Sequence, residues 1–222
     1  MLTGWQTWLA AADRNTWGLV DMSVSASQAN CHVLATCPAG SGPAVANAIK
    51  SAVGVQPTGV EHKTLSHMDL VMYLAGGSAT SSPRSFVAGS DVIGTMNSAA
   101  AQSIVAALGK WPPASGRASV IVDTLSGAVG DVDPSGSAFP WRRQSAVAQW
   151  YVETPGSGQV AAANKWIGAA HQAVQQFSVG AYVNYLEPNT APARYFGPNL
   201  ARLTAIRQRY DPGQLMYSGI VF

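Results

Sequence analysis

Apolar residues recur at two spacings along the chain, and each spacing predicts a different kind of element. Near the start of the chain, Trp5, Trp8, Leu9 and Ala12 stand three or four positions apart, which is typical of a helix with one buried face. Short runs rich in β-branched and aromatic residues predict strands instead. Further helices are expected over residues 41–53, 62–75, 98–108, 159–177 and 195–210, strands over residues 19–24, 30–37, 85–88, 119–123, 146–152 and 180–185, and a polar loop over residues 78–83.

The order of these elements predicts an α+β fold. Strands 19–24 and 30–37 are joined by a short polar turn, as in a hairpin, and no parallel β-α-β pattern is visible. We therefore expect an antiparallel β-sheet with helices packed mainly on one face. This region covers residues 1–178. Residues 179–222 are expected to form a separate C-terminal strand–helix segment with an apolar end at 215–222.

Composition and charge narrow the classes of partner. Hydrophobic residues make up 47% of the chain and charged residues 11%, which is typical of a compact globular protein. The formal net charge of +2 does not favour a polyanionic partner. The one basic cluster, Arg202, Arg207 and Arg209, is interpreted as a solvated helix face, so no nucleic acid is expected. No stretch is long and apolar enough to span a bilayer, so no membrane is expected either.

The two cysteines and the glycines at residues 40–42 are interpreted as structural residues and not as parts of a binding site. Cys31 and Cys37 lie on one expected strand, where about 3.3 Å per residue separates their Cα atoms by roughly 20 Å, beyond the ~7 Å limit for a disulfide. We expect two free thiols and no metal site. Residues 40–42 (GSG) resemble the start of a dinucleotide-binding loop, but Val45 occupies the place of the third glycine. A turn followed by a helix start explains them better.

The histidines do not form a recognisable catalytic motif. The sequence contains no GxSxG nucleophile elbow and no HExxH metal motif. His62 and His67 are five residues apart and share a helix face poorly, and His171 lies among small apolar residues of an expected helix. Each is interpreted as a surface or core-edge residue rather than a catalyst.

The expected strand at 180–185 carries the most informative polar side chains. Strand alternation places Tyr182 and Asn184 on one side and Val183 and Tyr185 on the other. A phenol beside a carboxamide suits a polar, planar ligand, because the amide can donate and accept hydrogen bonds and the phenol can transfer a proton if its pKa is lowered. The same pattern is also compatible with an amphipathic edge strand that faces water.

Three C-terminal segments resemble the signature of the berberine bridge enzyme-like FAD-linked oxidases. They are residues 181–186 (AYVNYL), 194–203 (RYFGPNLARL) and 206–212 (IRQRYDP). Three upstream segments are similar to landmarks of the family's substrate domain, namely residues 5–8 (WQTW), 86–91 (FVAGSD) and 138–142 (AFPWR). The resemblance therefore touches nearly the whole chain and is strongest over its last 45 or so residues.

The resemblance implies that the chain is the C-terminal half of such an enzyme. In the family, a first module holds FAD, a second domain of antiparallel sheet and helices covers the flavin ring, and the last segment returns to the flavin module. This chain resembles the second domain and the return segment, so we expect FAD not to be retained by this chain alone. The implied partners are a flavin module, as an upstream domain or another protein, and a small-molecule substrate.

The resemblance also implies roles for individual side chains. Asn184 would contact the pyrimidine edge of the flavin, with Tyr182 beside it. Tyr182 or Tyr185 would stand near the reacting substrate as a base. The expected substrate-binding residues are Gln149, Tyr151 and Trp141, and no metal ligand is expected.

Departures from the family pattern indicate an altered pocket. Trp141 replaces a usual histidine, Gly89 stands where a lysine often precedes the serine, and residues 214–216 replace the usual N-x-F ending. The resemblance therefore predicts the reaction class, oxidation of an alcohol or amine carbon by hydride transfer to flavin, without naming the substrate.

Two functions follow as expectations. The first is an oxidoreductase half that is inactive in isolation and exposes an apolar patch at Leu200, Leu203, Ile206 and the chain end, so that the isolated chain tends to associate, for instance as a homo-oligomer. The alternative is a stand-alone, non-catalytic binding or interaction domain derived from such an enzyme.

Overall fold

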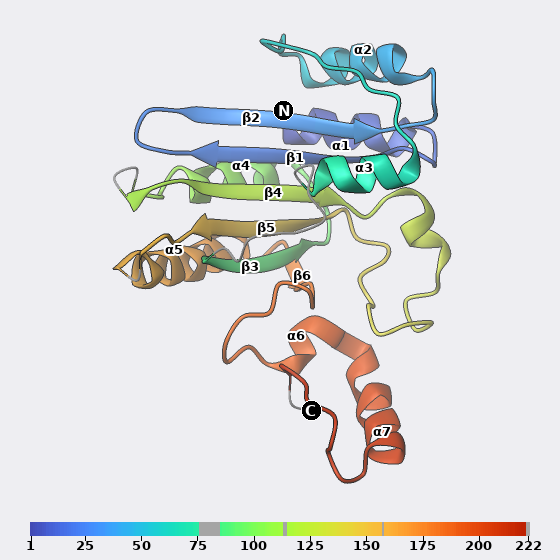
Figure 1. Ribbon diagram of the computed structural model, residues 1–222, viewed down its shortest axis with the longest axis vertical. Helices are drawn as coiled ribbons and strands as arrows, with labels where there is room; N and C mark the ends of the chain where they lie inside the picture. The colour runs from blue at the N-terminus through green and yellow to red at the C-terminus, as the bar shows by residue number, and fades with distance from the viewer. Residues whose placement is uncertain (76–84, 113–114, 157, 221–222) are drawn as a thin grey trace.

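The computed structural model describes residues 1–75, 85–112, 115–156 and 158–220. The polar loop expected at residues 78–83 and the last two residues of the apolar end lie outside this part. Within it, one sheet has the strand order β2-β1-β4-β5-β3-β6, and every neighbouring pair is antiparallel (Figure 1). The strands are β1 (Trp17–Val24), β2 (Ala29–Thr36), β3 (Phe86–Ile93), β4 (Ala118–Thr124), β5 (Ala146–Glu153) and β6 (Ser178–Gly180).

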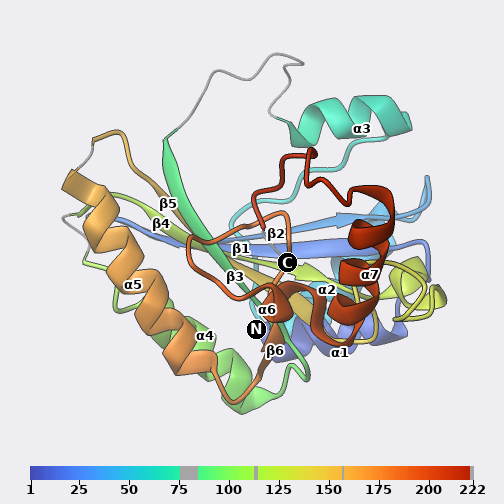
Figure 2. The ribbon, with the colours of Figure 1, turned by 90° about the horizontal axis from the view of Figure 1, so that it is seen from below.

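Helices cover mainly one face of this sheet, as predicted. Figure 2 shows α1, α4 and α5 on the same side of the strands, with α2 beside α1, whereas α3 lies on the opposite side. The helical elements are α1 (Leu2–Ala11), α2 (Gly42–Val53), α3 (His67–Leu74), α4 (Ser98–Leu108), η2 (Gly127–Asp131), α5 (Gly158–Val174), α6 (Pro192–Phe196), η3 (Gly197–Asn199) and α7 (Leu200–Tyr210). The predicted α+β class, with an antiparallel sheet and a C-terminal segment containing a strand and helices, is confirmed.

The main core lies between the sheet and these helices. Alternate strand residues such as Val20, Val120 and Trp150 are completely buried there, because side chains of successive strand residues point to opposite faces. Trp166 of α5 packs edge-on against Trp150 at 5.7 Å between ring centroids. In β5 the buried residues Ala148, Trp150 and Val152 alternate with the half-buried Gln149 and Tyr151.

The other face of the sheet, which we call the open face, is polar. It carries the residues that alternate with the buried ones, including Asp21, Asp123, Gln149 and Tyr151, all of which are half-buried. Helix α3 lies on this side but buries none of its own residues. The sheet thus presents one apolar, covered face and one polar face that is accessible to a ligand or a partner.

Several boundaries differ from the sequence-based expectation for identifiable reasons. The helix expected from residue 62 begins at His67, because the Ser66 hydroxyl caps it by accepting the Asp69 N–H at 3.2 Å. The helix expected over residues 195–210 is divided into α6, η3 and α7, because Gly197 adopts a positive φ of 45°. By contrast, the turn and helix start expected at residues 40–42 are confirmed, with α2 beginning at Gly42.

The strand predicted at residues 180–185 is wrong. Strand β6 ends at Gly180, and the following residues form a turn in which the Tyr185 N–H donates to the Tyr182 carbonyl at 3.0 Å. Only Val92 and Ile93 of β3 pair with β6, and the register is irregular there. Alternation in the sequence could not reveal that the available partner strand is so short.

The C-terminal residues 179–220, which we call the return segment, have a small apolar cluster of their own. Tyr195 and Phe196 are buried together with Ala181 and Ile220, and Leu200 and Leu203 pack partly against them. The expected apolar stripe is therefore covered in part, because Leu200 and Leu203 are half-buried and only Ile206 is exposed.

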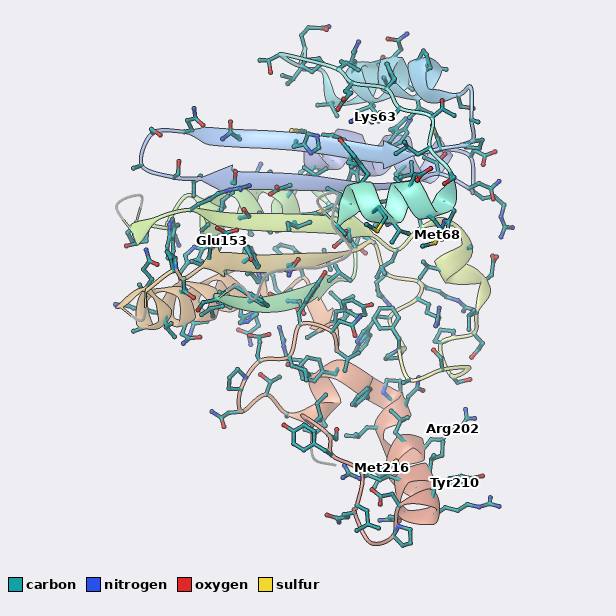
Figure 3. All side chains as sticks on the ribbon, in the orientation of Figure 1. Lys63, Met68, Glu153, Arg202, Tyr210 and Met216 are labelled. Atoms are coloured by element: carbon teal, nitrogen blue, oxygen red, sulfur yellow. The ribbon has the colours of Figure 1, made fainter. Side chains whose placement is uncertain are left out.

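The outer end of the return segment is exposed. Leu215 retains 91% and Tyr217 97% of their accessible surface, and Figure 3 shows Tyr210 and Met216 at this end of the molecule. Leu215, Met216 and Tyr217 belong to the apolar end that the sequence predicts to be exposed.

No helix among the described residues is long and apolar enough to cross a membrane.

Candidate functional site

The predicted tyrosine–asparagine constellation lies on a turn at the edge of the sheet. Residues 181–187, which we call the edge loop, begin where the Tyr182 N–H donates to Ser90 Oγ of β3 at 2.9 Å. The Asn184 amide donates to Tyr182 Oη at 2.8 Å, and the rings of Tyr182 and Tyr185 meet edge-on at 5.3 Å. All three predicted side chains are thus brought together, although by a turn and not by strand alternation.

Asn184 has the chemistry required for the edge of a flavin. Its side chain is exposed, and its hydrogen bond to Tyr182 uses only one of the two amide N–H bonds. Its carbonyl oxygen and other N–H remain a donor–acceptor pair, which matches the alternating carbonyl and N–H groups of a pyrimidine ring. The residue therefore fits the role that the sequence motif implies.

Asp123, which the sequence reasoning missed, lies on the open face near Tyr185. Burial raises the pKa of Asp123 to about 6. Burial also raises the pKa of Tyr185 to about 12, with smaller contributions from the negative charge of Asp123 and from Tyr182. A carboxylic acid at the end of an apolar strand (residues 119–123, SVIVD) was the signal that could have identified it.

This pair of pKa values separates the possible roles of the two groups. A carboxylate whose pKa lies near 6 can accept a proton at neutral pH, whereas a phenol with a pKa of about 12 stays protonated and donates a hydrogen bond. Of the two tyrosines that the resemblance implies as a base, Tyr185 has an environment that suits a hydrogen-bond donor, and the role of Tyr182 as the base stays a prediction. Tyr182 keeps its predicted position beside Asn184.

Gln149 and Tyr151 lie next to each other along β5 on the open face. In the sheet register Gln149 faces Ile121 of β4, and Tyr151 faces Ser119. The ring of Tyr151 packs against Phe86 at 5.3 Å. Both side chains are half-buried and belong to the accessible face, so the structure is compatible with the predicted substrate contact.

Trp141 is placed differently from the other two predicted substrate-binding residues. Its indole ring fills the space above Gly180 and Gly197, where an added Cβ atom would come within 2.3 Å and 2.7 Å of the ring. Its Nε1–H donates to the Tyr195 carbonyl at 3.1 Å. These contacts indicate that Trp141 anchors the return segment, while its neighbour Phe139 meets the ring of Tyr182 edge-on at 5.5 Å.

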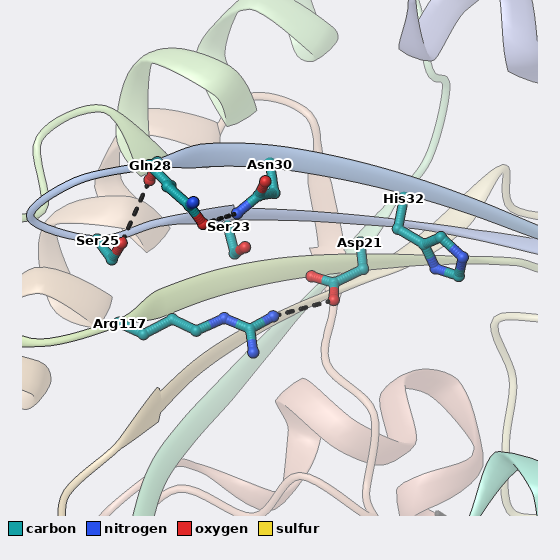
Figure 4. A pocket seen from close by; sticks show the side chains of 7 residues that line it. All are labelled: Asp21, Ser23, Ser25, Gln28, Asn30, His32 and Arg117. Atoms are coloured by element: carbon teal, nitrogen blue, oxygen red, sulfur yellow. Dashed lines mark hydrogen bonds and ion pairs between the residues drawn. The ribbon is translucent and has the colours of Figure 1, made fainter. Parts of the chain in front are cut away.

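The open face continues into a polar hollow of about 340 Å³ beside the β1–β2 hairpin (Figure 4). Arg117 forms an ion pair with Asp21 at 3.4 Å there. The residues that line it are Asp21, Ser23, Ser25, Gln28, Asn30, His32 and Arg117. A smaller adjoining hollow includes Tyr151 and Glu153, so polar groups extend from the centre of the sheet to its β2 edge. Polar residues at alternate positions, Asp21, Ser23 and Ser25, were the sequence signal for this region.

His171 is the residue whose surroundings the sequence did not predict. Its Nδ1 lies 2.7 Å from Asp91 Oδ2, and its Nε2 lies 2.6 Å from Glu187 Oε2. Arg194 also contacts Asp91, at 2.6 Å. Burial opposes the positive charge of His171, but hydrogen bonds to the two carboxylates and their negative charges outweigh it and raise its pKa to about 9. We call Asp91, His171, Glu187 and Arg194 the charged cluster.

The described residues show neither a metal-binding group nor a disulfide. The described residues contain no group of three or more histidine, cysteine, aspartate or glutamate side chains arranged to hold a metal ion. Cys31 and Cys37 are free thiols.

Two comparisons of sequence find proteins that are similar to parts of this chain. Residues 181–217 match the family "Berberine and berberine like". The uncharacterized FAD-linked oxidoreductase YgaK of Bacillus subtilis is 30% identical over 98 residues, which is 43% of this chain and 22% of that protein. The match to the family thus falls on the edge loop, α6 and α7.

Comparisons of structure extend the similarity to nearly the whole fold. Physcomitrella patens BBE-like 1 has a TM-score of 0.77 and 17% identity over 97% of this chain and 48% of its own length. A chitooligosaccharide oxidase also has a TM-score of 0.77, with 21% identity over 95% of this chain and 49% of its own. The chain therefore spans about half the length of the solved structures that it matches, and at these identities the likeness shows the fold.

Proposed function

Because the chain is related to the berberine bridge enzyme-like FAD-linked oxidoreductases and spans about half their length, we propose that it forms the substrate-binding half of such an enzyme. The observation that carries the proposal is the edge loop, which gathers Tyr182, Asn184 and Tyr185 beside the polar open face. The second half, which holds FAD, is supplied by an upstream domain or by a partner protein.

The proposed reaction oxidises an alcohol or amine by removing a hydride from the carbon and a proton from the attached oxygen or nitrogen. The bound flavin supplies the acceptor for the hydride that leaves the substrate carbon. The O–H or N–H proton of the substrate passes to a base on this chain, and the carbon–oxygen or carbon–nitrogen bond becomes a double bond. Loss of one hydride and one proton balances the oxidation.

Side chains of this chain position the reactants and hold the proton. Asn184 would hold the pyrimidine edge of FAD through its side-chain carbonyl and the N–H that Tyr182 does not use. Asp123 is the base that we favour, because its pKa of about 6 leaves it ionised but still able to bind a proton at neutral pH. Tyr185 stays protonated and donates a hydrogen bond to the substrate oxygen or nitrogen. Tyr182 orients Asn184 through their mutual hydrogen bond.

The polar open face supports a small substrate rich in hydroxyl groups. Gln149 and Tyr151 offer an amide and a phenol near the centre of the sheet, and the hollow around Asp21 and Arg117 adds further donors and acceptors. Such mixed groups bind hydroxyl groups better than they bind an apolar ring system. The name of one structural neighbour, chitooligosaccharide oxidase, is consistent with this class.

Co-expression tests the proposed function directly. The chain would be produced together with an FAD-binding module of the berberine bridge enzyme-like family and purified through a tag on this chain alone. We expect visible flavin absorbance to co-purify and to be bleached by a suitable alcohol under anaerobic conditions. Asn184→Ala should weaken flavin retention, whereas Asp123→Asn should retain flavin and slow bleaching by about 100-fold or more, the usual loss when a general base is removed.

A surface variant provides the control for these measurements. Lys63→Ala removes a charge that pairs with Glu61 on an exposed segment, and it should leave both flavin retention and bleaching unchanged. If the chain purifies without flavin from every co-expression and binds a ligand with equal affinity in Asp123→Asn, the alternative of a non-catalytic binding domain would replace the oxidoreductase proposal.

A further inference from the structure

The outer edge of β3 is completed by side chains in place of a neighbouring strand. Strand β6 pairs only with Val92 and Ile93, which leaves the N–H and carbonyl of Ser90 directed away from β5. The Ser90 N–H donates to Glu187 Oε1 at 3.2 Å, and the Ser90 carbonyl accepts from Arg194 Nη2 at 3.0 Å. Unpaired edge groups of a sheet need such partners when they are buried, and here a carboxylate and a guanidinium provide them.

The hydrogen bonds of His171 require a protonated ring. Both ring nitrogens lie within 2.7 Å of a carboxylate oxygen, one from Asp91 and one from Glu187. A neutral imidazole has only one N–H, so its second nitrogen would direct a lone pair at a carboxylate oxygen. An imidazolium donates to both, and such charge-assisted hydrogen bonds are short and strong. Two cations, His171 and Arg194, then balance two anions, Asp91 and Glu187.

The charged cluster joins four segments that are distant in the sequence. Asp91 belongs to β3, His171 to α5, Glu187 to the edge loop and Arg194 to α6. Asp91 has a completely buried side chain and also accepts hydrogen bonds from Trp150 and Ser178. Since the Tyr182 N–H is bonded to Ser90 and Glu187 is bonded to Ser90 and His171, both ends of the edge loop are fixed to β3.

We propose that the charged cluster is a clasp that fixes the edge loop against β3, with His171 as the positioning residue that links Glu187 to Asp91. Tyr182, Asn184 and Tyr185 lie between the two fixed points, so breaking the clasp frees them together. Deprotonation of His171 removes one donated hydrogen bond and leaves the two carboxylates with Arg194 as the only cation of the cluster. The clasp therefore opens at high pH.

The clasp requires a residue without a side chain at position 89, which Gly89 provides. An added Cβ at this position would lie 2.6 Å from Glu187 Oε2 and 2.9 Å from Ile167 Cγ2. Any side chain at residue 89 would thus occupy the place of the Glu187 carboxylate. Gly89→Ala displaces Glu187 without removing a charge, and it complements Glu187→Gln, which removes the charge without adding volume.

Two measurements on the flavin-free chain test the clasp. An NMR titration follows the imidazole of His171, one of four histidines in the chain and assignable through a His171→Gln variant. Hydrogen exchange, corrected for intrinsic rates, follows the amides of residues 182–187 and those of β4 and β5 in the unsubstituted chain, Glu187→Gln, Gly89→Ala and the Lys63→Ala control.

We expect His171 in the unsubstituted chain to titrate well above its ordinary range and to move back towards that range in Glu187→Gln and Gly89→Ala. Exchange of the edge-loop amides should become about tenfold faster or more in these two variants and, at high pH, in the unsubstituted chain. Exchange in β4 and β5 should not change, and Lys63→Ala should behave as the unsubstituted chain.

An ordinary titration of His171 in the unsubstituted chain would overturn the proposal, even if neither variant folded. Unchanged exchange of the edge loop in both folded variants would overturn it as well. The proposal depends on the proposed function only in treating the loop side chains as site residues. Its readouts need no flavin, so failure of the clasp and failure of the oxidoreductase assignment are separate results.

Discussion

The sheet-and-helix body and the return segment are stabilised in different ways. The body has an extensive core of completely buried side chains, including Trp5, Ile104 and Trp150. The return segment buries only a few apolar residues, around Tyr195 and Phe196, and is attached to the body by ion pairs and hydrogen bonds. Burial of apolar surface is not directional, whereas the polar contacts fix particular atoms in place.

The difference assigns separate tasks to the two regions. The body maintains the fold and the open face, and the return segment determines where Tyr182, Asn184 and Tyr185 stand. A large apolar core tolerates small adjustments, but a hydrogen-bonded cluster loses its geometry when one partner is removed. We therefore expect substitutions at the connection between the regions to affect the site more than substitutions on either surface.

The largest effect is expected for Asp91→Ala, at the connection itself. The side chain of Asp91 is completely buried, and its removal leaves His171 and Arg194 without their shared carboxylate. Breaking a buried ion pair in this way costs about 3–5 kcal/mol. Denaturant unfolding followed by tryptophan fluorescence would measure the loss. A decrease below about 1 kcal/mol would show that the cluster is not part of the stabilising connection.

The second prediction concerns how the free energy of unfolding depends on pH, and it tests the connection between the two regions without a substitution. The pKa of folded His171, about 9, lies above its ordinary value of 6.5, so its stabilising contribution is complete below pH 6.5 and is lost as pH rises through about 9. We expect a loss of about 1–3 kcal/mol over this window. Unfolding curves at several pH values would measure it, and His171→Gln should abolish the dependence. An equal alkaline loss in His171→Gln would assign it to other groups.

The third prediction has the opposite sign and concerns the open face. The folded-state pKa of Asp123 is raised from 3.8 to about 6, so ionisation of its carboxyl destabilises the folded chain as pH rises from about 4 through 6. Asp123→Asn removes this penalty and should stabilise the chain by about 1–2 kcal/mol at neutral pH. Thermal unfolding at pH 5 and pH 8 would test this, with a larger gain expected at pH 8. A destabilised Asp123→Asn variant would contradict the raised pKa.

The smallest effect is expected for Arg117→Ala in the polar hollow. Its ion pair with Asp21 is solvent-accessible, with 56% of the Arg117 side chain exposed, and such pairs contribute about 0–1 kcal/mol. Stability should therefore hardly change, whereas the KM for an extended, hydroxyl-rich substrate should rise in the reconstituted enzyme. An unchanged KM together with unchanged stability would exclude the hollow from substrate binding.

The sequence predicted the body well because its signals are local. Periodic apolar residues identified most helices and strands, and the polar turn between β1 and β2 predicted their hairpin. The strand expected at residues 180–185 was wrong because its extent depends on β3, which offers a partner only at Val92 and Ile93. The charge on His171 could not be foreseen, since Asp91 is 80 residues away from it in sequence.

The candidate site was predicted through motifs, and its geometry arose from contacts that no motif describes. Tyr182, Asn184 and Tyr185 were identified as a group, and the turn that unites them was not. Asp123 was missed although it ends an apolar strand, because the sequence does not show that this strand places it near Tyr185. Trp141 was assigned to the substrate, whereas its ring fills the space left by Gly180 and Gly197; its contact with a substrate stays a prediction.

The central claim is that this chain completes a flavoenzyme by covering a flavin held by another module, and anaerobic spectroscopy of the co-purified complex tests it most directly. We expect flavin absorbance to accompany the tagged chain and to be bleached on addition of a hydroxyl-bearing substrate, and we expect Asp123→Asn to retain the absorbance but slow the bleaching. A complex whose bound flavin is bleached at the same rate with and without Asp123 and Asn184 would contradict the claim.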